Sequence, residues 1–145
     1  MIAAQIRDFY ICSLSCRSIV YKGLFLAESL STFYPDLQDE RFESRVAIFH
    51  QRYSTNTFPQ WWLAQPFRSL AHNGEINTIK GNVNKMKSKE FLLDSKFLTR
   101  QEIEMMLPIC DPERSDSGNL DSIIEFLVFG GRSLPHAMMM LIPEA

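Results

Sequence analysis

The side chains best suited to chemistry lie in two neighbouring polar segments. The segment "HQRYSTNTFPQWW" at 50–62 contains Arg52. The segment "AHNGEINT" at 71–78 contains Asn73 and Gly74. A guanidinium holds a carboxylate through two parallel hydrogen bonds, and an Asn amide beside a Gly backbone N–H provides two donors for a developing oxyanion. The two segments therefore predict the rim of one pocket for a small polar ligand.

Asp116 adds a carboxylate that can hold an ammonium group. Together with Arg52, it suits a small zwitterion. A second interpretation stays open, in which Arg52 forms a structural ion pair and Asp116 caps a helix. In that interpretation Asn73 and Gly74 form an ordinary turn.

The composition is that of a globular domain without a strong charge bias. The 145 residues are 46% apolar with a formal net charge of -2, which predicts one domain or part of one. The balance of 15 Lys+Arg against 17 Asp+Glu gives no overall electrostatic reason to bind nucleic acid or an anionic membrane. No segment reaches the ~18 apolar residues of a membrane span. Arg7 and Asp8 interrupt any signal-peptide core, so we expect a soluble compartment.

Cys12, Cys16 and Cys110 are an odd set without the CxxC spacing of structural zinc sites. They cannot form a full disulfide framework. We expect three reduced thiols in or near the core and no metal site.

Four short segments rich in Ile, Val, Tyr and Leu predict β-strands, at 8–14, 17–23, 46–50 and 69–73. The first two are expected to pair antiparallel through a tight connection. The continuous apolar run at 46–50 indicates a strand buried on both faces. Since the last two segments lead into the polar segments, we expect the candidate site at strand ends.

Three helices are predicted in the second half, within 77–95, 116–131 and 133–145. The first has Asn77 or Thr78 as a possible N-cap. The second has apolar residues at helical spacing and Gly130 as its stop, with Asp116 and Ser117 just before the helix. In the third, Pro135 fits the first turn and Pro143 ends the helix.

Read whole, four strings closely resemble the glutaminase domain of the glutamate synthase large subunit, a class II glutamine amidotransferase. These are "FYICSLSCRSIVYKG", "HQRYSTNTFPQWWLAQPFRSLAHNGEINTIKGN", "SDSGNLD" and "SLPHAMMMLIPEA". The resemblance covers nearly the whole chain. It implies an α+β fold, part of the four-layer αββα sandwich of N-terminal-nucleophile hydrolases, and hydrolysis of glutamine to glutamate and ammonia for glutamate biosynthesis.

The resemblance also implies roles for the candidate residues. Arg52 would bind the α-carboxylate of glutamine, and Asp116 its α-ammonium group. Asn73 and Gly74 would form the oxyanion hole, with Gly74 also contacting substrate. Enzymes of this class use an N-terminal cysteine whose own amine is the general base, whereas Cys12 is internal and therefore a poor nucleophile.

We therefore expect residues 1–145 to be a partial domain, an internal fragment without the N-terminal nucleophile strand and the C-terminal part. The isolated chain is expected to lack glutaminase activity. No cofactor is expected in this segment, since FMN and an iron–sulfur cluster belong to other regions of such enzymes. The expected partners are L-glutamine, the synthase domain, and a small electron-transfer subunit or ferredoxin. The expected location is the cytoplasm, or the plastid stroma in a photosynthetic eukaryote.

Two other functions stay open. The chain can be a catalytically inactive fragment that binds an amino acid or a partner chain. It can also be another class II amidotransferase, of the amidophosphoribosyltransferase or asparagine synthetase type. The insert "STNTFPQWWLAQPFR" between Arg52 and Asn73 argues against that second alternative.

Overall fold

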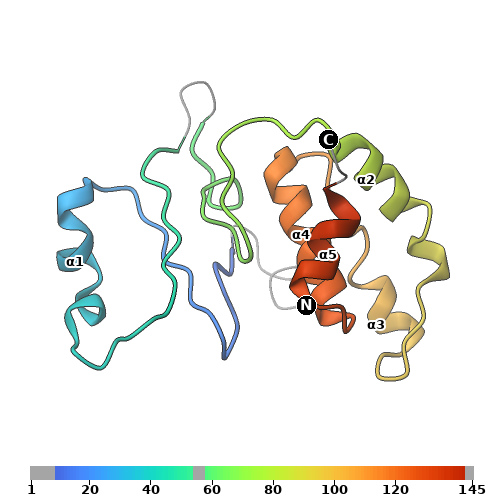
Figure 1. The fold of residues 1–145 in the computed structure, drawn as a ribbon, viewed down its shortest axis with the longest axis horizontal. Coiled ribbons are helices and arrows are strands. Elements are labelled where there is room, and N and C mark those ends of the chain that lie inside the picture. The colour runs from blue at the N-terminus through green and yellow to red at the C-terminus, as the bar shows by residue number, and fades with distance from the viewer. Residues whose placement is uncertain (1–8, 54–57, 143–145) are drawn as a thin grey trace.

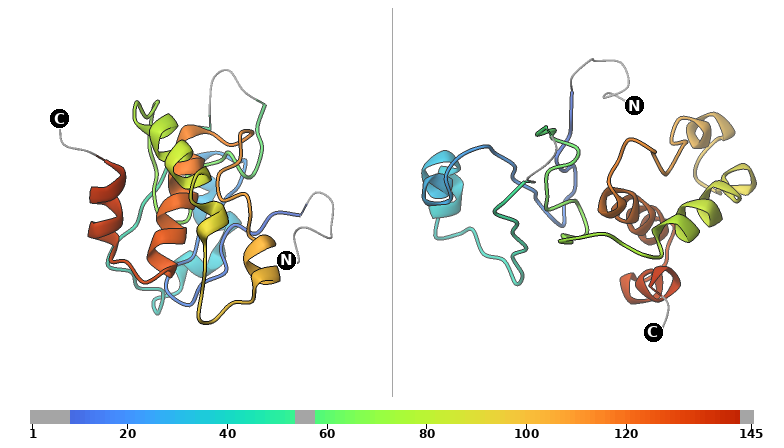
Figure 2. Two further views of the ribbon diagram at one scale, coloured as in Figure 1. Left: turned by 90° about the vertical axis from the view of Figure 1, so that its right-hand side faces the viewer. Right: turned by 90° about the horizontal axis from the view of Figure 1, so that it is seen from above.

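The computed structural model describes residues 9–53 and 58–142, and the regular elements found there are helices. The α-helices are α1 (Leu30–Phe33), α2 (Ile79–Lys87), α3 (Arg100–Glu104), α4 (Asp116–Phe129) and α5 (Leu134–Leu141). The short 3-10 helices are η2 (Ala27–Ser29), η3 (Pro35–Gln38) and η4 (Glu90–Leu92). Helices α2 to α5 gather on one side of the molecule, and α1 lies on the other side (Figure 1, Figure 2). Long irregular segments separate α1 from the other helices.

Helix α4 contacts both α2 and α5 on the helical side. Its Ile123 and Ile124 are almost completely buried. The other buried members of this core are Cys110, Leu120 and Leu141. Because apolar residues recur along α4 at three- and four-residue spacing, one stripe of the helix can bury itself against both neighbours.

The ends of α4 follow from local signals. Ser115 is the N-cap, and its hydroxyl accepts a hydrogen bond from the N–H of Gly118 at 3.1 Å. Gly130 is the C-cap, as predicted. Asp116 is the first residue of the helix. The prediction that Asp116 and Ser117 precede the helix is therefore wrong by two residues, because Ser115 provides the capping hydroxyl.

The predictions for α2 and α5 are largely confirmed. Thr78 is the N-cap of α2, and Pro135 lies in the first turn of α5. The prediction for α2 extended further than the helix, because the chain turns into η4 after Lys87. Pro143 lies outside the described residues. Asn82 is buried in α2 and donates from its Nδ2 to the carbonyl of Leu141 at 2.8 Å, which ties α2 to the end of α5.

Helix α3 was not predicted from the apolar pattern. It begins with a capping box, in which the Thr99 hydroxyl accepts from the Glu102 N–H at 3.3 Å. In return, the Glu102 carboxylate accepts from the Thr99 N–H at 2.8 Å. The spacing Thr-x-x-Glu is a readable signal for this helix start.

The four strand predictions are wrong for the described residues. Residues 9–14, 17–23, 46–50 and 69–73 contain no β-strand. A strand is defined by a ladder of hydrogen bonds to a neighbour, and these segments form no such ladder with another described segment. The local apolar pattern was present, but the pairing that makes a strand depends on other parts of a chain.

The segment at 46–50 also differs in burial from the prediction. Phe49 is 85% exposed and Val46 is 71% exposed, whereas a strand buried on both faces was expected. Ile19 in the 17–23 segment is likewise exposed. Within residues 9–53 and 58–142 the regular elements are helices, so the two sheets of the expected αββα sandwich are not formed there. The side chains of Ile19, Val46 and Phe49, which were expected to face a sheet core, lie exposed.

Candidate functional site

The loop that carries Asn73 and Gly74 is fixed at its start by Gln65. The Gln65 side chain accepts from the N–H of His72 at 2.6 Å and donates to the His72 carbonyl at 2.7 Å. These two bonds imitate the pairing that a neighbouring strand would provide. We refer to residues 65–76 as the 65–76 loop.

Gly74 has a φ of +138°, a conformation that side chains with a Cβ rarely adopt. An added Cβ would meet only the ring of His72, at 4.0 Å. The position therefore requires glycine for its backbone and not for lack of space. The ring Nδ1 of His72 lies 3.2 Å from the Gly74 carbonyl oxygen, which further fixes the turn. Both Asn73 and Gly74 are exposed, so their donors are accessible to a ligand.

Asp116 joins the start of α4 to the far end of this loop. Its Oδ2 accepts a hydrogen bond from the N–H of Ile76 at 3.3 Å. The side chain is only partly buried. A carboxylate has room for several donors, so Asp116 can hold this N–H and still accept from a ligand ammonium. The structure thus brings Asp116 to the loop that carries Asn73 and Gly74.

Arg52 is not joined to this group. It is exposed, and the ion pairs between described residues do not include it. Those pairs are Arg41–Asp39, Arg68–Glu125 and Arg100–Glu104. The alternative of Arg52 as a structural ion-pair partner therefore gains no support from the described residues.

Asp121 is a residue that the sequence analysis missed. Its carboxylate accepts from the backbone N–H groups of Arg68, Ser69 and Leu70, at 3.1, 2.7 and 3.1 Å. Burial raises the pKa of this carboxyl, while the three N–H groups act in the opposite direction. The signal in the sequence was an aspartate within the apolar stretch of a predicted helix. A carboxylate at such a place is buried and therefore needs hydrogen-bond partners.

Lys22 was missed as well. Its ammonium donates to the carbonyls of Trp61 and Ala64, at 3.0 and 2.6 Å, and to the Tyr10 hydroxyl at 3.2 Å. It also lies over the Tyr10 and Phe67 rings, at 4.8 and 5.6 Å from their centroids. Lys22 therefore holds the turn at 61–64, between Arg52 and the 65–76 loop, against the N-terminal segments.

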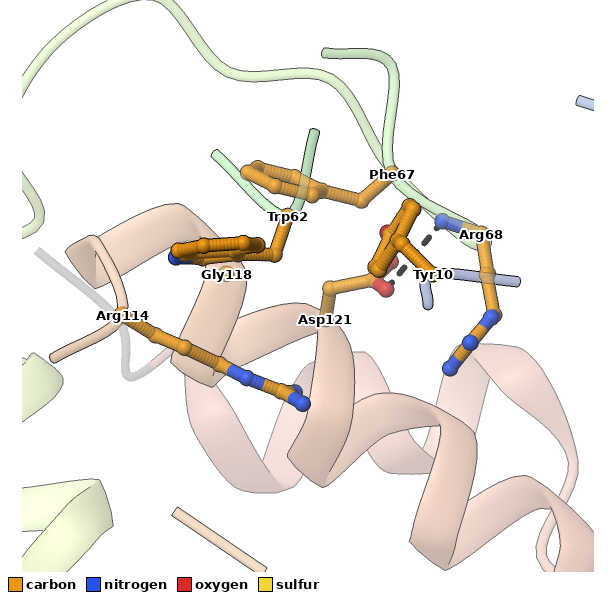
Figure 3. Close-up of a pocket in the computed structure, with 7 residues that line it drawn as sticks. All are labelled: Tyr10, Trp62, Phe67, Arg68, Arg114, Gly118 and Asp121. Atoms are coloured by element: carbon orange, nitrogen blue, oxygen red, sulfur yellow. Dashed lines mark hydrogen bonds between the residues drawn. The ribbon is translucent and has the colours of Figure 1, made fainter. Parts of the chain in front are cut away.

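A small hollow lies beside this loop, at the junction with α4 (Figure 3). Its accessible space is about 20 Å³, roughly the room of one water molecule. It is lined by Tyr10, Trp62, Phe67, Arg68, Arg114, Gly118 and Asp121. None of the predicted ligand residues lines it, and it is far too small for an amino acid. The hollow marks the place where the loop is anchored and not a substrate pocket.

The cysteines are free thiols. Cys110 is buried as expected and Cys12 is partly buried, but Cys16 is exposed, so the prediction of a near-core position is wrong for Cys16. Cys16 lies in an irregular segment that no sheet covers. Within the described residues no group of three or more His, Cys, Asp or Glu side chains can hold a metal ion.

The family model described as "Glutamine amidotransferases class-II" matches residues 1–145. The chain belongs to the class II glutamine amidotransferases. This amidotransferase segment is 61% identical over 141 residues to the "Glutamate synthase [NADPH] large chain" of Azospirillum brasilense, a match that covers 97% of this chain and 9% of that protein. It is 56% identical over 138 residues to the "Ferredoxin-dependent glutamate synthase, chloroplastic" of rice, covering 95% of this chain and 8% of the relative.

A third relative, the "Ferredoxin-dependent glutamate synthase 2" of a Synechocystis strain, is 51% identical over 138 residues. The match covers 95% of this chain and 9% of that protein. The amidotransferase segment thus spans less than a tenth of the length of these relatives. No helix in the described part of the segment is long and apolar enough to cross a membrane.

We expect the Lys22 amine to titrate near pH 8 in the folded chain. Burial lowers its pKa from 10.5 to about 8. The unfolded chain keeps this proton to higher pH, so Lys22 should make folding more favourable as the pH rises from about 8 to 10. NMR titration of the side-chain carbon Cε measures the pKa, with Lys22→Arg identifying the resonance. An inflection at the ordinary value of 10.5 would contradict the buried position of the amine.

Proposed function

We propose that this segment supplies the glutamine-binding and oxyanion-stabilising residues of the glutaminase site of a glutamate synthase. Glutamine would be hydrolysed there to glutamate and ammonia. The observation that carries the proposal is the hydrogen bond from Ile76 to Asp116, in a chain that belongs to the class II glutamine amidotransferases. This bond brings a carboxylate for the substrate ammonium close to the donors for the oxyanion.

In the proposed reaction, a thiolate attacks the side-chain amide carbon of glutamine and forms a tetrahedral oxyanion. The Asn73 amide and the Gly74 N–H stabilise that negative charge, which is the largest single contribution in many acyl transfers. Collapse of the oxyanion releases ammonia and leaves a thioester, which water hydrolyses to glutamate. Cys12 has a peptide bond at its nitrogen and lacks the free amine that would activate it, so we assign the nucleophile to a cysteine of another segment.

Arg52 is proposed to bind the substrate α-carboxylate. Its side chain is exposed and has no ion-pair partner among the described residues, which leaves the planar guanidinium available for a two-pronged contact. Arg52 lies outside the group formed by Asp116 and the loop. We infer that Arg52 and the group formed by Asp116 and the loop bind opposite charged ends of the same substrate molecule.

We also propose that segments 17–23 and 46–50 become strands of the αββα sandwich when they pair with other strands of a complete domain. Membership in the amidotransferase family and the uncovered side chains of Ile19, Val46 and Phe49 support this proposal. Pairing would give the backbone N–H and C=O groups of these segments hydrogen-bond partners and would also cover their apolar side chains.

Within the whole enzyme, we propose that the ammonia passes to a synthase domain. FMN and an iron–sulfur cluster would be bound by the synthase domain and other regions of the enzyme. For the cluster, this is supported by the cysteines of this segment, which are free thiols and belong to no metal-ligating group among the described residues. The reductant would be either ferredoxin or a nicotinamide cofactor acting through a small subunit. The relatives are named for both kinds of donor, so the similarity does not choose between them.

Two substitutions in the complete enzyme test the substrate-binding roles. Arg52→Lys should raise the KM for glutamine strongly, because a lysine keeps the charge but cannot form the planar two-pronged contact. Asp116→Asn should also raise KM, because the substrate ammonium loses its counter-charge. Steady-state kinetics with glutamine measure both effects. An unchanged KM in both variants would contradict the substrate-binding roles assigned to Arg52 and Asp116.

Asn73→Ala tests the oxyanion role separately. Its amide matters chiefly once the carbonyl oxygen has become an oxyanion, so kcat should fall by about 10²-fold or more while KM changes little. Ammonia release under saturating glutamine measures kcat. If the substitution altered only KM, Asn73 would be a substrate-binding residue and not an oxyanion donor.

A further inference from the structure

Asp121 is placed where three consecutive N–H groups of the 65–76 loop converge. Its Oδ1 accepts from Ser69 and Leu70, and its Oδ2 accepts from Arg68. Figure 3 shows the carboxylate directed at the backbone nitrogen of Arg68. The residue is only 5% exposed, so these bonds are shielded from competing water.

The chemistry of this contact demands a carboxylate. Three donors converge on two oxygens, and an ionised carboxylate is an acceptor at every lone pair. An asparagine whose oxygen stayed on Ser69 and Leu70 would turn its NH₂ group toward the N–H of Arg68, so two donors would face each other. A buried N–H left without an acceptor is costly. Asn is therefore a nearly equal-sized substitution that breaks one defined bond.

The anchored residues are tightly connected to the oxyanion donors. The N–H of Phe67 donates to the Leu70 carbonyl at 2.9 Å, which closes a turn over the anchored stretch. The buried Phe67 ring also packs near Gly118 of α4, where an added Cβ would lie 3.7 Å from it. Only two residues separate Leu70 from Asn73, and one of them, His72, is itself held by Gln65. A shift at 68–70 would therefore reach the donors through only two intervening residues.

We propose that Asp121 is a positioning residue for the oxyanion donors Asn73 and Gly74. It fixes the loop that carries them on α4 and does not itself contact substrate. The same helix begins with Asp116, to which the substrate ammonium is assigned. One rigid helix would thus set the spacing between the ammonium-binding carboxylate and the oxyanion hole. This inference rests on the proposed function.

The test uses the complete enzyme with Asp121→Asn and Asp121→Ala. Asp121→Asn should lower kcat about tenfold with little change in KM, since small misplacements of catalytic groups cost up to about 10²-fold. Asp121→Ala should lower kcat further, but not beyond the loss for Asn73→Ala. The control is Glu125→Gln, one turn further along α4, which contacts the Arg68 side chain at 3.1 Å but none of the three loop N–H groups. Its kcat should stay close to that of the parent enzyme.

A double variant separates positioning from general stability. If Asp121 acts through the donors, Asn73→Ala combined with Asp121→Asn should lose clearly less activity than the product of the two single losses. Losses that multiply would show that Asp121 acts elsewhere and would overturn the inference.

The remaining outcomes distinguish the inference from the proposed function. If Asn73→Ala lowers kcat but Asp121→Asn lowers only the melting temperature, Asp121 is structural and the inference fails alone. If Asn73→Ala leaves kcat unchanged, the oxyanion role in the proposed function fails and the inference fails with it. If the Asp121 variants do not fold, an ester in place of the peptide N–H of Ser69 removes the shortest bond, of 2.7 Å, without changing a side chain. A lower kcat then supports the proposal, and an unchanged kcat overturns it.

Discussion

Backbone N–H groups that lack a partner strand need other acceptors, and in the 65–76 loop side chains provide them. Asp121 accepts from three N–H groups, Asp116 accepts from Ile76, and Gln65 pairs with His72. Two of these three side chains lie on α4. Since Ile123 and Ile124 bury α4 against its neighbours, the loop takes its position from the best-packed element of the described chain.

This arrangement gives α4 two roles along its length. Its middle residues Leu120, Ile123 and Ile124 pack into the core, and Asp116 and Asp121 carry the carboxylates that reach the loop. Gly74 has a positive φ, and both Asn73 and Gly74 are exposed. On the other side, Lys22 holds the turn at 61–64, which follows Arg52 in the chain. The loop and the turn that precedes it are therefore held by separate charged side chains, Asp121 and Lys22.

The sequence was sufficient for the features that depend on local signals. The spacing of apolar residues with Gly130 predicted α4, and Pro135 was expected in the first turn of α5. The strand predictions failed because pairing depends on segments distant in the chain. The partners of Asp121 are backbone N–H groups more than 50 residues away, so only its unusual place inside an apolar helix pointed to it. The roles of Arg52, Asn73, Gly74 and Asp116 remain proposals, supported by family membership and by the contact at Ile76.

Hydrogen exchange at the Ser69 amide tests most directly whether α4 holds the loop. The amide donates to the buried Asp121 carboxylate at 2.7 Å, so it should exchange much more slowly than an amide without an acceptor. In Asp121→Ala the Ser69 amide should lose this protection, while amides near Ile124 keep theirs. Exchange of Ser69 at the rate of an unstructured peptide in the unchanged protein would contradict the anchoring of the loop on α4.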